Sequence, residues 1–88
     1  MIIPDSFLEY YFGKYRQVDL HNLTKEDARA ELIYAIETTD FDVTSLIVIH
    51  GYHGGTVIKN FVRKEFSHNL ILEKINLDAG RTVFKLKR

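Results

Sequence analysis

The chain has 88 residues, of which 45% are hydrophobic and 12% aromatic, so it is long enough for one folded domain with a single core and too short for two. It contains no cysteine, which excludes disulfides and thiolate metal sites and suits a reducing, cytoplasmic environment. We expect no signal peptide and no membrane span, because the first residues lack a basic region and no uncharged run reaches about 18 residues.

The formal net charge is zero, but the charge is unevenly distributed. Residues 1–43 carry four basic and nine acidic side chains, whereas residues 44–88 carry eight basic and three acidic ones. The basic second half is compatible with a polyanionic partner. It is equally compatible with solvated surface charge, so composition leaves both interpretations open.

Residues 1–14 are predicted to form an N-terminal extension to a domain over residues 15–88. Ser6 is a candidate cap for a short helix that stops at Gly13. This helix would present an aromatic cluster, formed by Phe7, Tyr10 and Tyr11, to the core or to another subunit.

The next residues predict a strand over 15–20 and a helix that begins after Thr24 and ends near Thr39. Thr24 is the expected N-cap, with Asp27 at the capping-box spacing. The apolar positions of this helix recur at helical spacing and predict one buried stripe, made of Ala28, Leu32, Ala35 and Ile36.

Residues 45–49 form an unbroken apolar run, which is typical of a strand buried on both faces. A second helix should begin at Gly55 or Thr56, with an inward face formed by Val57, Phe61, Val62 and Phe66 and an outward face formed by Lys59, Arg63 and Lys64. Two further strands, over 70–77 and 82–87, are joined by a turn at 78–80.

The predicted order, β-α-β-α-β-β, indicates an α/β (α+β) two-layer sandwich with a mixed four-stranded sheet and two helices on one face. The first two strands should be parallel, with a right-handed crossover, and the last two should form an antiparallel hairpin. The other face of the sheet is expected to be partly open or to meet the N-terminal segment.

Polar residues follow the first two strands at the point where each ends. Asp19 and His21 follow the first strand, and His50 and Gly51 follow the second. Because the carboxyl ends of parallel neighbours meet at one edge of a sheet, these residues are expected to share a site.

Two ordered motifs in this region resemble those of the small MutS-related (Smr) domain family. Residues 18–22, Val-Asp-Leu-His-Asn, resemble the family's Leu-Asp-Leu-His-Gly motif, with Val18 in place of Leu and Asn22 in place of Gly. Residues 50–55, His-Gly-Tyr-His-Gly-Gly, resemble its His-Gly-x-Gly-x-Gly motif, with His53 at the middle glycine. The resemblance extends over residues 18–88.

The resemblance implies a fold similar to the C-terminal domain of translation initiation factor 3, binding of DNA or RNA, and in several members endonuclease or DNA-nicking activity. By position, it assigns Asp19 and His21 to the first motif and His50, Gly51 and Gly55 to the second.

The chemistry of the residues suggests a role for each of them. His21 and His50 are a candidate acid–base pair for a phosphodiester, with Asp19 orienting one ring. Phosphate would be held by the turn and the helix start that follows it, through Gly51, Gly54, Gly55 and Thr56. The remaining candidates act by base stacking, for Tyr52 and His53, and by phosphate neutralisation, for Lys59 and Arg63.

Each assignment has a simpler alternative, in which the histidines are structural and the glycines serve only the turn. A divalent metal held by imidazole and carboxylate is a further alternative, although no His-x-x-x-His spacing supports it. The leading hypothesis is a nucleic-acid-binding domain with endonuclease activity, and its alternative is a non-catalytic nucleic-acid-binding or protein-interaction module. We expect a monomer or a weak homodimer.

Overall fold

The computed structural model describes residues 4–51 and 56–88. Its elements, in chain order, are η1 (Asp5–Phe7), α1 (Leu8–Phe12), β1 (Tyr15–Asp19), α2 (Lys25–Thr38), β2 (Ser45–Ile49), α3 (Val57–Asn60), η2 (Phe61–Glu65), β3 (Ile71–Asp78) and β4 (Arg81–Leu86). Among these residues, no helix is long and apolar enough to cross a membrane.

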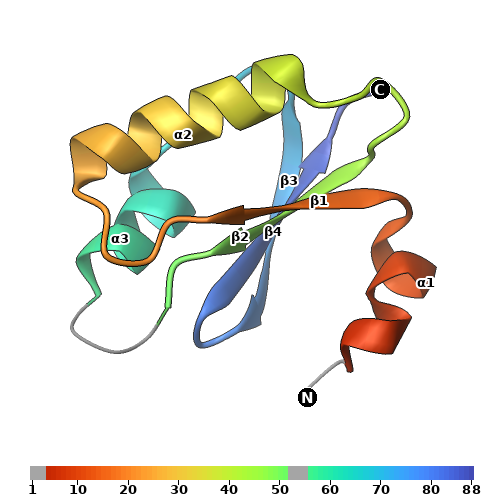
Figure 1. The fold of residues 1–88 in the computed structure, drawn as a ribbon, viewed down its shortest axis with the longest axis horizontal. Coiled ribbons are helices and arrows are strands. Elements are labelled where there is room, and N and C mark those ends of the chain that lie inside the picture. Colours follow the sequence, from red (N-terminus) through yellow and green to blue (C-terminus); the bar gives the residue numbers. More distant parts are fainter. Residues whose placement is uncertain (1–3, 52–55) are drawn as a thin grey trace.

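The four strands form one mixed sheet in the order β1-β2-β4-β3 (Figure 1). β1 and β2 are parallel, and Asp19 is paired with Ile49 at their ends. β4 is antiparallel to both β2 and β3. The predicted α/β class, strand order along the chain and strand directions are therefore confirmed.

The helices α2 and α3 and the helical turn η2 cover one face of this sheet. Thr24 caps α2, since its hydroxyl accepts a hydrogen bond from the Asp27 N–H at 3.1 Å. The predicted α2 stripe is buried against the sheet, together with strand residues of the same face such as Val18, Val48 and Phe84.

The N-terminal segment covers part of the opposite face. Leu8 and Phe12 of α1 pack with Ile47, Leu77 and Val83 in a second buried cluster. Gly13 ends the helix as predicted, with φ at +71°. The prediction for Ser6 is wrong, because Ser6 lies inside the 3-10 turn η1, whose N-cap is Pro4.

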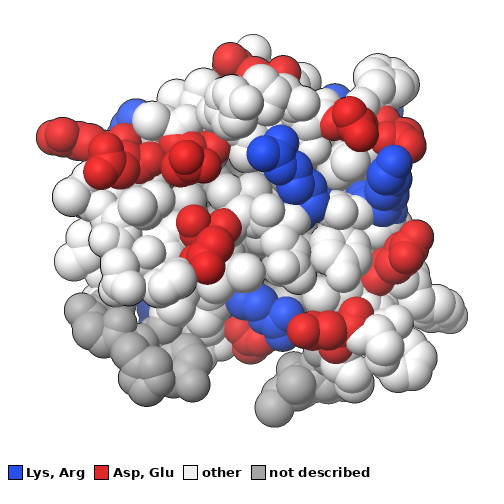
Figure 2. Space-filling model, viewed as in Figure 1, with Lys and Arg blue, Asp and Glu red and all other residues white. Residues whose placement is uncertain are grey.

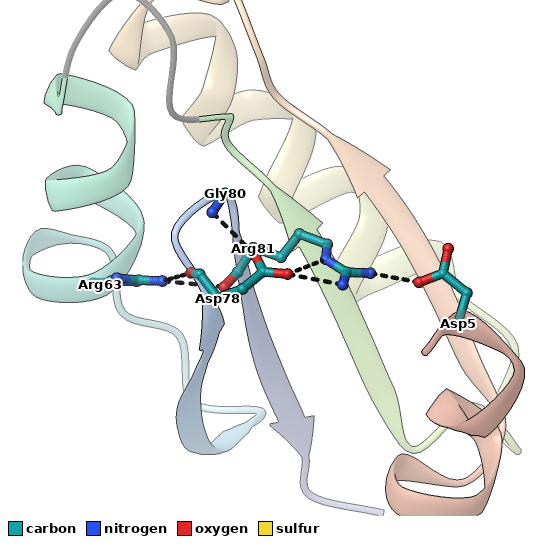
Figure 3. Close-up of polar contacts among 5 residues, drawn as sticks. All are labelled: Asp5, Arg63, Asp78, Gly80 and Arg81. Atoms are coloured by element: carbon teal, nitrogen blue, oxygen red, sulfur yellow. Dashed lines mark hydrogen bonds and ion pairs between the residues drawn. The ribbon is translucent and has the colours of Figure 1, made fainter. Parts of the chain in front are cut away.

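A charged contact fastens this segment to the β3–β4 hairpin (Figure 3). Arg81 Nε donates a hydrogen bond to Asp78 at 2.9 Å, and its Nη2 forms an ion pair with the same carboxylate at 2.8 Å. Nη1 of Arg81 donates to Asp5 at 3.0 Å. Residues 4–13 are therefore held by apolar contacts on the face of the sheet and by an ion pair with Arg81 at the start of β4.

The third helix departs from the predicted pattern. Phe61, Val62 and Phe66 are buried as expected, but Val57 is 61% exposed, and Ile58 packs on the core instead. In a regular α-helix, Phe61 and Phe66 would lie about 140° apart. The π-helical turn η2, closed by the Phe66 N–H on the Phe61 carbonyl, brings their rings to 5.8 Å between centroids.

We predict that Leu8→Ala lowers the free energy of unfolding by about 2 to 5 kcal/mol, because it removes a fully buried side chain from the second cluster. Tyr10→Ala, on the same helix but 79% exposed, should change it by less than about 0.5 kcal/mol. Denaturant unfolding of both variants measures the difference. Equal effects would mean that α1 does not contribute to the core.

Candidate functional site

The ends of β1 and β2 meet as the sequence predicts. The Leu20 N–H donates to the Ile49 carbonyl at 2.7 Å, which extends the parallel pairing beyond the strands. Gly51 then turns with φ at +74°, and a Cβ at this position would lie 3.4 Å from the Cβ of His21. A residue with a side chain would be strained at Gly51, so glycine allows the two segments to lie together.

Asn22 has φ at +67° and is the only residue other than glycine with a positive φ among those described. This is the position at which the Smr motif usually has glycine. Asparagine is among the residues that best tolerate the left-handed region, so its presence here keeps the turn geometry that a glycine would allow.

Asp19 and His21 form a pair at the surface. One carboxylate oxygen, Oδ1 of Asp19, accepts from the His21 backbone N–H at 3.1 Å and from its ring Nδ1 at 2.5 Å. Partial burial raises the pKa of Asp19, but these two hydrogen bonds and the charge of the imidazole outweigh that effect and lower it. Both side chains are about half exposed, and His21 Nε2 bonds to none of the described residues.

His50 lies in a different environment, with only 6% of its surface exposed. Its Nε2 is 2.9 Å from the Thr82 hydroxyl, and its Nδ1 is 3.1 Å from the Gly51 carbonyl. Burial lowers the pKa of His50 from 6.5, and the nearby charges of Arg63 and Lys59 lower it further. Both ring nitrogens are therefore engaged, and the neutral ring is favoured.

These contacts fix the tautomer of His50. A carbonyl only accepts, so Nδ1 carries the proton and Nε2 accepts from the Thr82 hydroxyl. The same hydroxyl accepts from Arg63 Nε at 2.7 Å. A continuous chain of hydrogen bonds thus runs from Arg63 through Thr82 and His50 to the Gly51 carbonyl.

Arg63 does not lie on an outward face, as the helical spacing predicts. Its Nη2 donates to the carbonyls of Asp78 and Arg81, at 2.5 and 3.1 Å, and so joins η2 to the hairpin (Figure 3). The prediction assumed a regular α-helix, whereas Phe61–Glu65 form the π-helical turn η2, which changes the direction of the Arg63 side chain. Its length then lets it reach the hairpin.

The hairpin also supports the site through its turn. The Gly80 carbonyl accepts hydrogen bonds from both the His50 and Gly51 N–H groups, at 2.9 and 3.0 Å. The sequence placed Gly80 in the predicted turn at 78–80, but it assigned neither Gly80 nor Thr82 to the site. Thr82 could have been found from the sequence, because the strand alternation places its hydroxyl on the same face as Phe84, where a buried hydroxyl needs a polar partner.

The remaining predicted residues are only partly described. Thr56 is exposed and precedes α3 without a side-chain capping bond, and Lys59 is half-buried near enough to His50 to lower its pKa. The predictions for Tyr52, His53, Gly54 and Gly55 fall outside the described residues. Within residues 4–51 and 56–88, no three His, Cys, Asp or Glu side chains gather in a way that could hold a metal ion.

Three of the eight basic residues of the second half are engaged within the fold. Arg63 and Arg81 bind the hairpin, while Lys74 donates to the Val62 and Phe66 carbonyls and is half-buried. On the face shown in Figure 2, basic and acidic groups are interspersed, and acidic groups lie over the N-terminal part of α2.

No protein-family model, curated protein or solved structure matches this chain.

We predict that Thr82→Val lowers the free energy of unfolding by about 1 to 3 kcal/mol, because it leaves Arg63 Nε and His50 Nε2 without their shared buried partner. Thr82→Ser keeps the hydroxyl and serves as the control. Thermal or denaturant unfolding would compare the two variants. If serine destabilises as much as valine, the effect comes from packing and not from the hydrogen-bond chain.

The buried position of His50 predicts a pH dependence. Because its pKa is lower in the folded chain than in the unfolded one, its contribution to stability is complete above about pH 6.5 and is lost as the pH falls below that value. NMR titration of the ring resonances should give His50 a midpoint below 6.5. A midpoint at or above 6.5 would contradict this environment.

Proposed function

We propose that this chain binds DNA or RNA in the cytoplasm at the sheet edge where β1 and β2 end, and that the Asp19–His21 pair acts there as an acid–base group on a phosphodiester. The observation that carries the proposal is the 2.5 Å contact between Asp19 Oδ1 and His21 Nδ1, which leaves the exposed ring with an unoccupied Nε2 among the described residues.

This geometry suits proton transfer. The carboxylate accepts the Nδ1 proton in a hydrogen bond, which leaves Nε2 as the acceptor, so Nε2 can take a proton from water or from a ribose 2′-hydroxyl as the oxygen of that group attacks phosphorus. As the bond from phosphorus to the leaving oxygen breaks, the same nitrogen returns the proton to that oxygen. One histidine then serves first as base and then as acid.

His50 has another role in this proposal. Its ring is buried and bonded at both nitrogens, so it is suited to hold the turn beside His21 and not to exchange protons with a substrate. The Gly51 backbone, held next to His21, supports a phosphate contact at the same edge. Of the two basic residues predicted to contact phosphate, Lys59 stays a candidate and Arg63 is committed to the hairpin.

Membership of the Smr family is part of the proposal. It is supported by the two motifs in order, by the approach of their backbones at Gly51, and by the positive φ of Asn22 where the family has glycine. The likeness of the fold to the C-terminal domain of translation initiation factor 3 follows from the same family assignment.

A non-catalytic module is the second candidate, and one observation favours it. The basic groups Arg63, Lys74 and Arg81 are engaged within the fold, which reduces the positive charge left for a polyanion. Such a module would bind nucleic acid without turnover, or would bind another protein.

The test is incubation of the purified chain with plasmid, single-stranded DNA and RNA, with and without a chelator. We expect cleavage, and we expect His21→Ala to reduce its rate by about 10² to 10⁴-fold while leaving substrate affinity unchanged. Asp19→Asn should also slow cleavage. His68→Gln, a change to a histidine that lies between η2 and β3 and contacts Glu37, serves as the matched control.

The outcomes separate the candidates. Cleavage that survives His21→Ala would remove the pair from the mechanism, and binding without cleavage would favour the non-catalytic module. If labelled DNA and RNA both fail to bind at low ionic strength, nucleic-acid binding itself is excluded.

A further inference from the structure

β1 lies at one edge of the sheet, and no described strand pairs with its outer side. In Figure 1 it passes in front of the other strands, with α2 to one side and α1 to the other. The Lys14 carbonyl and the Leu20 N–H both bond to the segment that contains β2. Since backbone groups alternate along a strand, Tyr15, Gln17 and Asp19 direct their N–H and C=O groups outward.

The two edges of the sheet differ in a way that bears on pairing. β3, at the opposite edge, has register shifts at Ile71/Glu73 and Asn76/Asp78, and such irregularities protect an edge from added strands. β1 has no such shift over residues 15–19. Of the two edges, β1 is therefore the one that retains a regular row of outward hydrogen-bonding groups.

Hollows in the surface lie on both faces of this strand. One is lined by Glu9, Tyr15 and Gln17, on the side of α1. The other is lined by Arg16, Thr38 and Asp40, among other residues, on the side of α2. A strand added outside β1 would direct successive side chains alternately to these two faces, so both have room for them.

We infer that the outer edge of β1 pairs with β1 of a second copy of this chain, antiparallel and with Gln17 opposite its own equivalent. In this register Tyr15 of each copy lies opposite Asp19 of the other, and the two Gln17 residues lie opposite each other. The outward N–H and C=O groups of one strand therefore meet the outward C=O and N–H groups of the other. The strand is thus complementary to itself, and the cross-strand pair of a phenol with a carboxylate adds a polar contact on the α1 face.

The second copy also contributes to the site. Residues directly opposite in an antiparallel pair have Cα atoms about 5.5 Å apart and side chains on the same face. Tyr15 of one copy is then the neighbour of Asp19 in the other, beside the pair that Asp19 makes with His21. This consequence for the site rests on the proposed function, whereas the pairing itself does not.

The test uses the full chain and measures both its mass in solution and the register in which the two β1 strands pair. Sedimentation at concentrations up to about 1 mM should show the apparent mass rising from 10.3 kDa toward twice that value. Gln17→Pro removes only an outward N–H, which an edge strand tolerates, and should abolish the rise. Gln17→Ala, the matched control, keeps that N–H and should retain it.

An isotope-filtered NMR experiment on mixed labelled and unlabelled chains tests the register directly, without any variant. It should give a contact between the Arg16 Hα of one copy and the Val18 Hα of the other, because these residues face each other in the non-hydrogen-bonded pair. A monomer throughout the range, a dimer that survives in a folded Gln17→Pro, or a dimer without this contact would overturn the inference. Cleavage is not among the readouts, so failure here leaves the proposed function standing.

Discussion

The hydroxyl of Thr82 is the contact on which the organisation of the site depends. It accepts from Arg63 Nε and donates to His50 Nε2, so it joins η2, β4 and the end of β2 at one atom. None of these groups is exposed: Thr82 is fully buried, His50 nearly so, and Arg63 partly so. A buried chain of this kind is favourable only while every member is satisfied, which makes the geometry of the three elements mutually dependent.

The fold places the two histidines in different environments. The side chain of His50 follows Val48 in the strand alternation and lies on the helix-covered face, where burial lowers the pKa of the ring. Asp19 alternates with Val18 and Leu20, which pack on that face, so its carboxylate lies on the other side of the sheet with His21. The two strand ends are adjacent in the backbone, yet their side chains serve opposite faces.

The sequence was sufficient where short-range patterns decide the structure. The unbroken apolar run predicted β2 at its observed residues, Thr24 predicted the start of α2, and Gly13 the end of α1. The meeting of the Asp19 and His50 regions also followed, because it depends only on parallel pairing. The exposure of Val57 and the direction of Arg63 did not follow, since they depend on the π-helical turn and on contacts between η2 and the hairpin that are distant in the sequence.

The positions of the charged side chains were also beyond what the sequence alone could predict. From the sequence, the eight basic residues after residue 43 are compatible with a surface for a polyanion and equally with solvated surface charge. In the fold, Arg63, Lys74 and Arg81 bind backbone carbonyls and carboxylates of their own hairpin and helix. A cation that is already paired inside the fold adds little to the attraction of a phosphate backbone. If the proposed nucleic-acid binding takes place where β1 and β2 end, it has to rely on the backbone around Gly51, the exposed His21 ring and the lysines that the fold does not engage, which favours contact with a single phosphate over binding along an extended duplex.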